Sequence, residues 1–236
     1  MSAPRVFLLH GLGADRRAFQ RFERLLPGDD WSITSLDLLG HGDAPRPQFG
    51  YALDDHAEHI TEEIVEAGAG SREPAILVGH SYGAATAVAL AASRPELVRG
   101  IVLLDPVVDL DLERIGSKTA QMIEAKREKH LEATVRTIYP DASDALRAWT
   151  VATWERMDMG VIEELDSDWT RFADQVTCPV TIIHGDVDQG GSGDISADYF
   201  NEPTVVRIAG AGHYLHATHA RETATAVIDA VSALVS

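Results

Sequence analysis

The chain of 236 residues has a single cysteine and no long apolar run. Because Cys178 has no second cysteine to pair with, no disulfide can form within the chain. Cys178 precedes Pro179 at the start of a predicted strand, where a small buried side chain is expected rather than a reactive thiol. No apolar stretch is long enough to cross a bilayer, and no charged segment followed by an apolar one marks a leader. These absences predict a cytoplasmic protein with no membrane partner.

Basic residues are also scarce. Lysine and arginine number 20 against 37 aspartates and glutamates, which gives a formal net charge of -17. An excess of negative charge of this size argues against nucleic acid or an anionic membrane as a partner. Neither a phosphate-binding loop nor a dinucleotide fingerprint is present, so no cofactor is expected. The expected partner is a small-molecule substrate.

The remaining chain alternates short apolar segments with longer helical patterns. Such alternation predicts an α/β fold with parallel strands. We expect six strands, at Arg5–Leu9, Trp31–Leu36, Ala75–His80, Gly100–Leu104, Cys178–His184 and Thr204–Ile208. The expected helices of this core are Arg16–Leu26, Leu53–Ala67, Ala84–Ser93 and Arg221–Val235.

A long gap without strand pattern interrupts this alternation. Apolar residues recur there at helical spacing, which predicts an insertion of about three helices. We therefore expect a core of residues 1–106 and 177–236 and a helical cap of residues 107–176. One half of the insertion is rich in large apolar side chains that suit a pocket wall, although most such residues only pack a core. These side chains are Trp149, Trp154, Trp169, Met157 and Met159.

One stretch carries a recognisable chemical motif. Gly79-His80-Ser81-Tyr82-Gly83 matches G-x-S-x-G between an apolar strand and an alanine-rich helix, the context in which this motif forms a nucleophile elbow. A serine on so tight a turn adopts a strained backbone. The residues two before and two after it are pressed together, which requires glycine at both places. The turn places the Ser81 hydroxyl at a helix N-terminus, which favours a developing oxyanion.

A serine nucleophile needs a base, and the base needs an orienting acid. His213 follows the sixth predicted strand, at the edge where Ser81 follows the third. Three aspartates could supply the acid. Asp186 and Asp188 follow the fifth strand, and Asp105 ends the fourth. Asp186 is closer to its strand, where it is expected to hold the loop through backbone hydrogen bonds.

Five motifs together resemble the α/β-hydrolase fold superfamily, in its serine-nucleophile, esterase-like branch. They are His10–Gly13, Asp37–Gly42, Gly79–Gly83, Gly185–Asp188 and Gly210–His213. The resemblance implies a sheet of about six parallel strands with flanking helices and a helical cap.

The same resemblance implies roles for individual residues. Ser81 would be the nucleophile, His213 the general base and Asp188 the acid of a catalytic triad. The backbone N–H groups of Leu12 and Tyr82 would form the oxyanion hole. The segment after Asp188 is unusually rich in glycine, and Asp105 is the main rival because some relatives take the acid from the fourth strand.

These residues predict a serine hydrolase that cleaves an ester, lactone or thioester through an acyl-enzyme. Two alternatives use the same pocket: a triad-based lyase or C–C hydrolase, and a small-molecule receptor with weak hydrolysis.

No metal is expected. The segment from Asp186 to Ala197 only partly mimics a calcium loop, and the histidines at 213, 216 and 219 lack an accompanying metal motif. His10 and His80 are expected to have structural hydrogen bonds, and His56 and His59 to lie on a solvated helix face.

Overall fold

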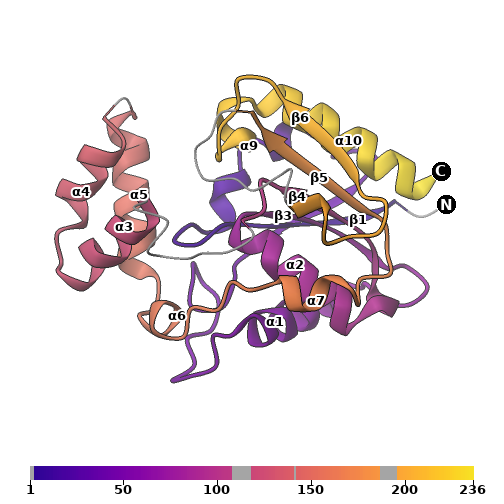
Figure 1. Cartoon of the computed structure of the whole chain (residues 1–236), viewed down its shortest axis with the longest axis horizontal. Coiled ribbons are helices and arrows are strands. Elements are labelled where there is room, and N and C mark those ends of the chain that lie inside the picture. Colours follow the sequence, from indigo (N-terminus) through magenta and orange to yellow (C-terminus); the bar gives the residue numbers. More distant parts are fainter. Residues whose placement is uncertain (1–2, 108–117, 141, 187–195) are drawn as a thin grey trace.

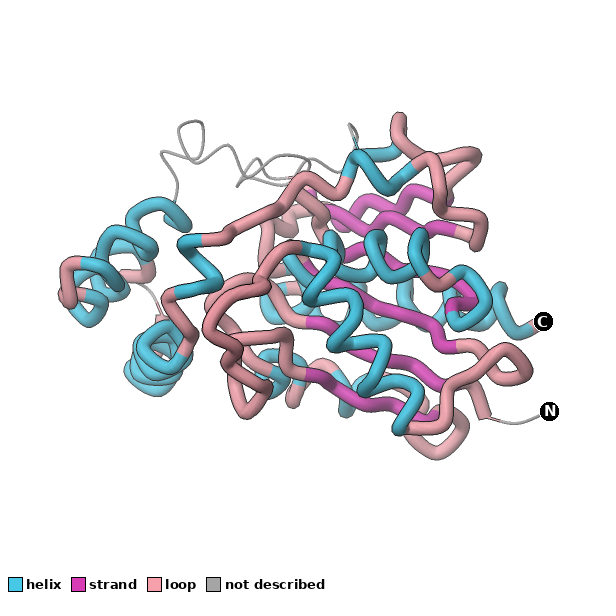
Figure 2. The backbone as a smooth tube through the Cα atoms, turned by 90° about the horizontal axis from the view of Figure 1, so that it is seen from below, coloured by secondary structure: helices cyan, strands magenta, loops and turns pink. Residues whose placement is uncertain are grey.

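The structure, a computed structural model, describes residues 3–107, 118–140, 142–186 and 196–236. Within these ranges, six strands form one parallel sheet in the order β2-β1-β3-β4-β5-β6 (Figures 1 and 2). This confirms the predicted sheet. The strands are β1 Arg5–Leu9, β2 Ser32–Leu36, β3 Ala75–His80, β4 Val98–Leu104, β5 Val180–Gly185 and β6 Thr204–Ile208.

The strand register brings the ends of β1, β3 and β4 to one edge of the sheet. Leu9 pairs with Gly79, and His80 pairs with Leu104. The residues that follow these strands therefore emerge side by side, since parallel strands present their carboxyl ends at the same edge. Ser81 and Asp105 are two of them.

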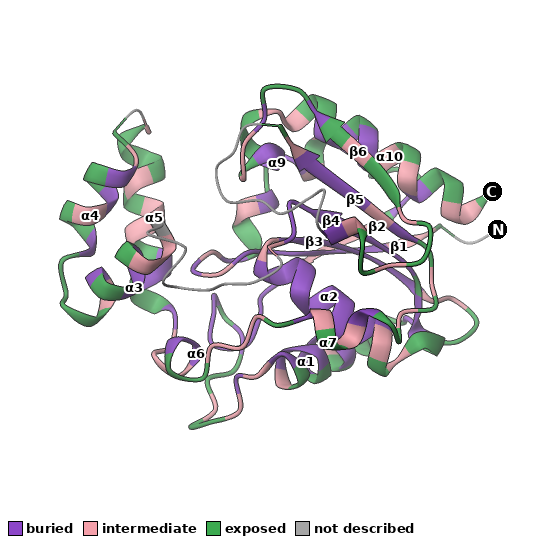
Figure 3. Cartoon of the chain, in the orientation of Figure 1, coloured by how far each residue is buried: buried purple, intermediate pink, exposed green. Residues whose placement is uncertain are grey.

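Helices cover both faces of the sheet. The α1 helix (Leu53–Glu66) and α2 helix (Tyr82–Ser93) pack on one face, and α10 (Ala220–Val235) and the short α9 (Leu215–Thr218) pack on the other (Figure 1). Strand β3 and helix α2 are buried almost throughout (Figure 3). Burial of both faces explains why β3 is continuously apolar rather than alternating.

The segment after β1 differs from its prediction. In place of one helix over Arg16–Leu26, the chain forms two 3₁₀ helices, η1 (Arg16–Phe19) and η2 (Glu23–Leu25). The backbone N–H of Arg16 donates to Asp37 Oδ1 at 2.7 Å, which ties the start of the segment to the loop after β2. Phe19 and Phe22 are both buried, and their i, i+3 spacing suits the tighter 3₁₀ turn. A third 3₁₀ turn, η3 (Pro95–Leu97), precedes β4.

The prediction for helix α1 is wrong on one point. His56 and His59 are buried rather than solvated. His56 lies three residues after Leu53 and four before Ile60, so it belongs to the apolar stripe that faces the sheet.

The segment between β4 and β5 contains five helices in its described part. They are α3 (Lys118–Arg127), α4 (Leu131–Ile138), α5 (Asp144–Arg156), α6 (Gly160–Glu163) and α7 (Thr170–Ala173). The first three, here called the insertion helices, pack on one another and stand beside the sheet (Figure 1). By contrast, α7 packs against α2, and the neighbouring Trp169 stacks on Phe200 in the core with ring centroids 5.5 Å apart. In the described ranges, none of the helices combines the length and apolarity that crossing a bilayer requires.

Candidate active site

The turn around Ser81 has the strained geometry that its sequence predicts. Ser81 has φ 52° and ψ -114°, which is a rare conformation for a residue with a side chain. A methyl group added at Gly79 would lie 2.3 Å from the carbonyl oxygen of Gly83, and one at Gly83 would lie 2.3 Å from that of Leu9. Both contacts are closer than atoms tolerate, so backbone packing requires glycine at both positions.

His213 contacts a carboxylate from the fourth strand. Its Nδ1 lies 2.6 Å from Oδ2 of Asp105, and only 4% of the Asp105 side chain is exposed. Asp105 has φ 45°, a left-handed conformation that aspartate adopts more readily than most residues. Its backbone N–H donates to the Ile183 carbonyl at 2.8 Å, which fixes the end of β4 against β5.

The other two candidate acids have different situations. Asp186 accepts a hydrogen bond from the backbone N–H of Gly210 at 2.6 Å, which is the loop-holding role expected of it. Asp188, which the resemblance favoured, lies outside the described residues, as does most of the calcium-like segment that follows. The described carboxylate at the imidazole is therefore that of Asp105.

Two buried histidines hold the loop that carries Leu12. His10 donates from Nδ1 to the Gly11 carbonyl at 2.8 Å and accepts the Leu38 N–H at Nε2. His41 accepts the Gly13 N–H at Nε2, at 3.2 Å. Burial lowers the pKa of both imidazoles, so they stay neutral and keep Nε2 as an acceptor. The structural role expected for His10 is confirmed, and His41, from the Asp37–Gly42 segment, has a similar structural role.

His80, the residue before the serine, joins the elbow to the loop of His213. Its Nε2–H donates to the backbone carbonyl of His213 at 2.8 Å. The centroid of the His80 ring also lies 4.7 Å from the centroid of the His213 ring and 4.4 Å from that of the His216 ring. Burial lowers the pKa of His80 well below the ordinary value, so it is uncharged and holds this bond at neutral pH.

A cavity of about 290 Å³ lies between the sheet edge and the insertion helices. Ser81, His213 and Leu12 line it from the core, and Trp149 and Trp154 line it from α5. The other three large side chains expected in the wall lie elsewhere: Met157 and Met159 belong to the packing of the insertion, and Trp169 belongs to the core.

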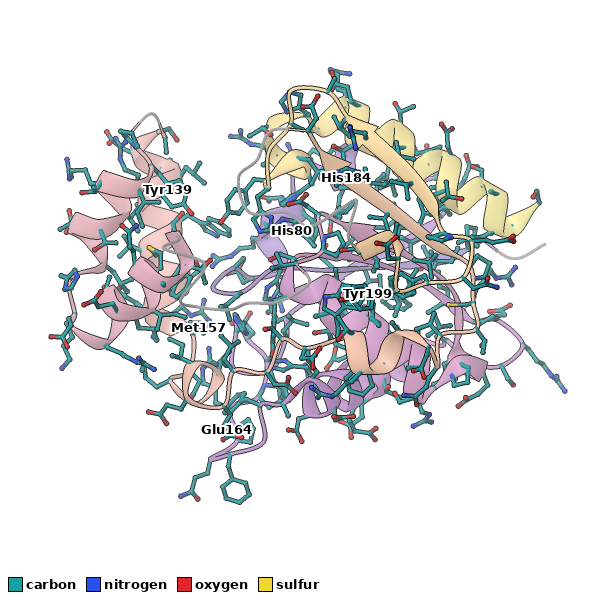
Figure 4. The ribbon with its side chains drawn as sticks, viewed as in Figure 1. His80, Tyr139, Met157, Glu164, His184 and Tyr199 are labelled. Carbon is teal, nitrogen blue, oxygen red and sulfur yellow. The ribbon has the colours of Figure 1, made fainter. Side chains whose placement is uncertain are left out.

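The insertion and the core meet across this cavity at a pair of tyrosines. The hydroxyl of Tyr139, at the end of α4, lies 3.2 Å from that of Tyr214, the residue after His213. Figure 4 shows Tyr139 on the insertion and His80 at the sheet edge that faces it. Trp154 packs on the loop after β1, where a methyl group at Gly13 would lie 2.1 Å from its indole.

Other reactive side chains have ordinary surroundings. Burial raises the pKa of the Cys178 thiol to about 11, so the thiolate is not its form at neutral pH. His216 is buried beside Phe19 and Phe22, with ring centroids 5.0 and 6.4 Å away. Among the residues described, no three histidine, cysteine, aspartate or glutamate side chains gather as a metal site.

Comparison with known proteins shows which family and fold the chain resembles. A sequence profile of the Alpha/beta hydrolase family matches residues 6–226. The chain is 27% identical to 2-(acetamidomethylene)succinate hydrolase of Mesorhizobium japonicum, over 98% of this chain and 89% of that protein. It is 32% identical to Lipase LipV of Mycobacterium tuberculosis, over 69% of this chain and 56% of that protein. The crystal structure of E-2-(acetamidomethylene)succinate hydrolase superposes with a TM-score of 0.76 and 25% identity, over 98% of this chain and 92% of that one.

Proposed function

The chain belongs to the alpha/beta hydrolase family, and from this membership and the geometry of the site we propose that it cleaves an ester, lactone or thioester through a serine nucleophile. The observation that carries the proposal is the 2.6 Å contact of Asp105 with His213, which lines the same cavity as Ser81. A serine hydroxyl, an imidazole and a buried carboxylate are the three groups of a Ser-His-Asp triad, which catalyses acyl transfer.

In the proposed mechanism, Ser81 Oγ attacks the carbonyl carbon of the substrate while His213 Nε2 takes the hydroxyl proton. The tetrahedral oxyanion receives hydrogen bonds from the backbone N–H groups of Leu12 and Tyr82. The protonated His213 then gives its proton to the leaving group, which leaves an acyl-enzyme. A water molecule, deprotonated by the same imidazole, releases the acid and restores Ser81.

We assign the third role to Asp105 in place of Asp188. Its Oδ2 accepts the Nδ1–H of His213, which leaves Nε2 free of its proton to act as the base. Asp105 also keeps the chain order of serine, then acid, then histidine that this fold uses. Its near-complete burial strengthens its attraction for the imidazolium that forms during the reaction.

The insertion helices act in this proposal as a cap that shapes the substrate site. Trp149 and Trp154 supply an apolar wall, and the neighbouring Leu146 and Met122 extend it. Such a wall suits an acyl chain or another apolar group next to the scissile carbonyl.

The proposal is tested by labelling with a fluorophosphonate and by turnover of short 4-nitrophenyl esters. We expect one covalent label on Ser81, and a folded Ser81→Ala protein should lose the label together with about 10⁵–10⁶-fold in rate. A folded Ser81→Ala protein that still hydrolyses these esters contradicts the serine mechanism. A wild-type protein that labels but turns over no ester favours the receptor alternative.

A further inference from the structure

The cavity beside Ser81 is apolar apart from hydroxyl groups, histidines and one cation. Among the described residues that line it, Arg147 is the one lysine, arginine, aspartate or glutamate. Burial lowers the pKa of the lining histidines His10, His80 and His216, so these three are uncharged at neutral pH. Arg147 on α5 is therefore the fixed positive charge of the described wall.

The guanidinium of Arg147 is oriented before any ligand arrives. Nη1 donates to the backbone carbonyls of Tyr139 and Pro140 at 3.3 and 3.0 Å, and Nη2 donates to Asp144 Oδ1 at 2.6 Å. These contacts account for three of the five N–H donors of a guanidinium. Only 21% of the Arg147 side chain is exposed, so its position is constrained by packing as well as by these bonds.

The ion pair between Arg147 and Asp144 is weak. The Asp144 side chain is 97% exposed, and ion pairs with so exposed a partner are weak because water screens them. A carboxylate that arrives from within the cavity meets the same guanidinium in a less hydrated place, where charge-assisted hydrogen bonds are stronger.

The net negative charge of the chain makes Arg147 important for binding an anionic substrate. A net charge of -17 repels anions in general, so an anionic substrate needs a local cation within the site. Arginine matches the planar shape of a carboxylate better than lysine does. An arginine set in an apolar wall is therefore suited to one negative group on an otherwise apolar molecule.

We propose that Arg147 binds a carboxylate of the substrate, remote from the bond that is cleaved, and that the substrates are carboxylate-bearing esters, lactones or thioesters. This inference rests on the proposed function. The apolar part of the substrate lies along the tryptophan wall, its scissile carbonyl lies at Ser81, and its carboxylate lies at α5. The incoming carboxylate competes with Asp144 for Nη2.

The test compares matched esters with and without a carboxylate. The first pair is the mono-4-nitrophenyl ester of adipic acid and 4-nitrophenyl hexanoate, which differ at the far end of the acyl chain. The second pair is 4-carboxyphenyl acetate and phenyl acetate, which differ on the alcohol side. We expect wild-type protein to prefer the carboxylate member of at least one pair, and the pair that responds identifies the side of the scissile bond.

Three variants separate recognition from structure. Arg147→Met should lower the preference, as a ratio of kcat/KM values, by roughly 10- to 100-fold, mainly through KM. Arg147→Lys should keep part of the preference because the charge remains. Asp144→Asn should keep or raise the preference, because it removes the competing carboxylate. The control Arg136→Met, an exposed arginine of α4 paired with Glu132, should leave the ratio unchanged.

The opposite results overturn the proposal. If Arg147 only holds the carbonyls of residues 139 and 140, Arg147→Met lowers kcat/KM for both members of each pair in parallel. A wild-type protein without preference in either pair also contradicts it.

Titration of adipate into folded Ser81→Ala protein by calorimetry tests anion binding without turnover. Binding that is lost in the Ser81→Ala, Arg147→Met double variant supports the carboxylate site even if ester hydrolysis fails, and absent binding contradicts it.

Discussion

Asp105 holds its carboxylate against His213 from a backbone conformation that few residues other than glycine adopt. Strain of this kind persists only where the surroundings impose it, and here the bond from its N–H to Ile183 does so. The neighbouring Ser81 is strained in a similar way. Two strained residues at adjacent strand ends thus set Ser81 in the cavity wall and the Asp105 carboxylate against His213.

Replacement of Asp105 by asparagine tests its role directly. Asparagine tolerates the left-handed backbone, so Asp105→Asn should fold, but it cannot stabilise the imidazolium and favours the wrong tautomer of His213. We expect kcat for a 4-nitrophenyl ester to fall by about 10³–10⁴-fold. Asp188→Asn is the matched control and should stay active. If Asp188→Asn is inactive and Asp105→Asn is active, the acid is Asp188, in the loop after β5.

The sequence predicted Ser81 and His213 as candidates because each residue has a local signature. The G-x-S-x-G motif and the histidine after the last strand need no long-range information. The acid is different, because three aspartates follow adjacent strands and only the distance between loops distinguishes them. That distance depends on how far each loop extends beyond the sheet, which spacing along the chain does not specify.

At the scale of elements, the crossing between β1, β3 and α2 leaves no room for side chains. A methyl group at Gly83 would lie 2.3 Å from the backbone oxygen of Leu9, the last residue of β1, and 2.6 Å from that of His10, which follows it. Both obstacles are backbone atoms at the end of β1, which cannot move aside as a flexible side chain can.

Gly83→Ala should therefore destabilise the protein by more than about 3 kcal/mol, which exceeds the effect of Ser81→Ala. Denaturant unfolding followed by circular dichroism measures both. Gly28→Ala is the control, because nothing lies within 4 Å of a methyl group at Gly28, and its stability should hardly change. Equal stabilities for Gly83→Ala and Gly28→Ala would show that the turn is not constrained as described.

The junction between β3 and the loop after β6 depends on the bond from His80 to the His213 carbonyl. His80→Phe keeps a ring there but removes the donor. We expect kcat to fall roughly 10- to 100-fold with KM nearly constant, since the base is displaced from Ser81 while the cavity wall is kept. His80→Gln, which can still donate, should recover part of the loss. If His80→Phe lowers thermal stability and leaves kcat intact, His80 does not position the base.

Prediction of elements succeeded where local patterns decide the structure. The buried strands and helix α2 are apolar on all sides and bounded by turn residues, so their positions follow from the sequence. The helix predicted at Arg16–Leu26 is wrong, because a contact with Asp37 and the packing of two phenylalanines favour 3₁₀ turns. Neither interaction can be seen in the periodicity of the sequence. Trp169 lies in the core rather than in the pocket wall because α7 packs against α2.

At the scale of the whole molecule, the chain buries histidine rings in groups that lie close to one another. His10, His41, His56, His80 and His216 are all at most 5% exposed. Burial is the largest cause of the lowered pKa of each. For His56 and His216 the pKa falls to about 3. These imidazoles are neutral in the folded protein and become charged readily only when it unfolds.

The stability of the fold should therefore fall as the medium becomes acidic. An unfolded histidine takes up a proton near pH 6.5, whereas folded His56 resists protonation until about pH 3. Between these values the unfolded chain binds more protons, so acid favours unfolding. The protein has its full stability above about pH 6.5. Below that pH, each such histidine lowers the free energy of unfolding by about 1.4 kcal/mol per pH unit. Denaturant unfolding at pH 7.5, 6.5 and 5.5 should show a steep decline only in the lower interval.

His56→Phe isolates one of these contributions, because phenylalanine keeps a ring against Tyr82, 5.2 Å from His56, without a titrating group. The pH slope of its unfolding free energy should fall by about 1.4 kcal/mol per pH unit below pH 6.5. His130, which is exposed before α4, provides the control, and His130→Phe should leave the slope unchanged. Equal slopes for wild type and His56→Phe would show that His56 is protonated in the folded state. Since His56 does not line the cavity, its loss should change acid stability without changing the selectivity of the site for its substrate.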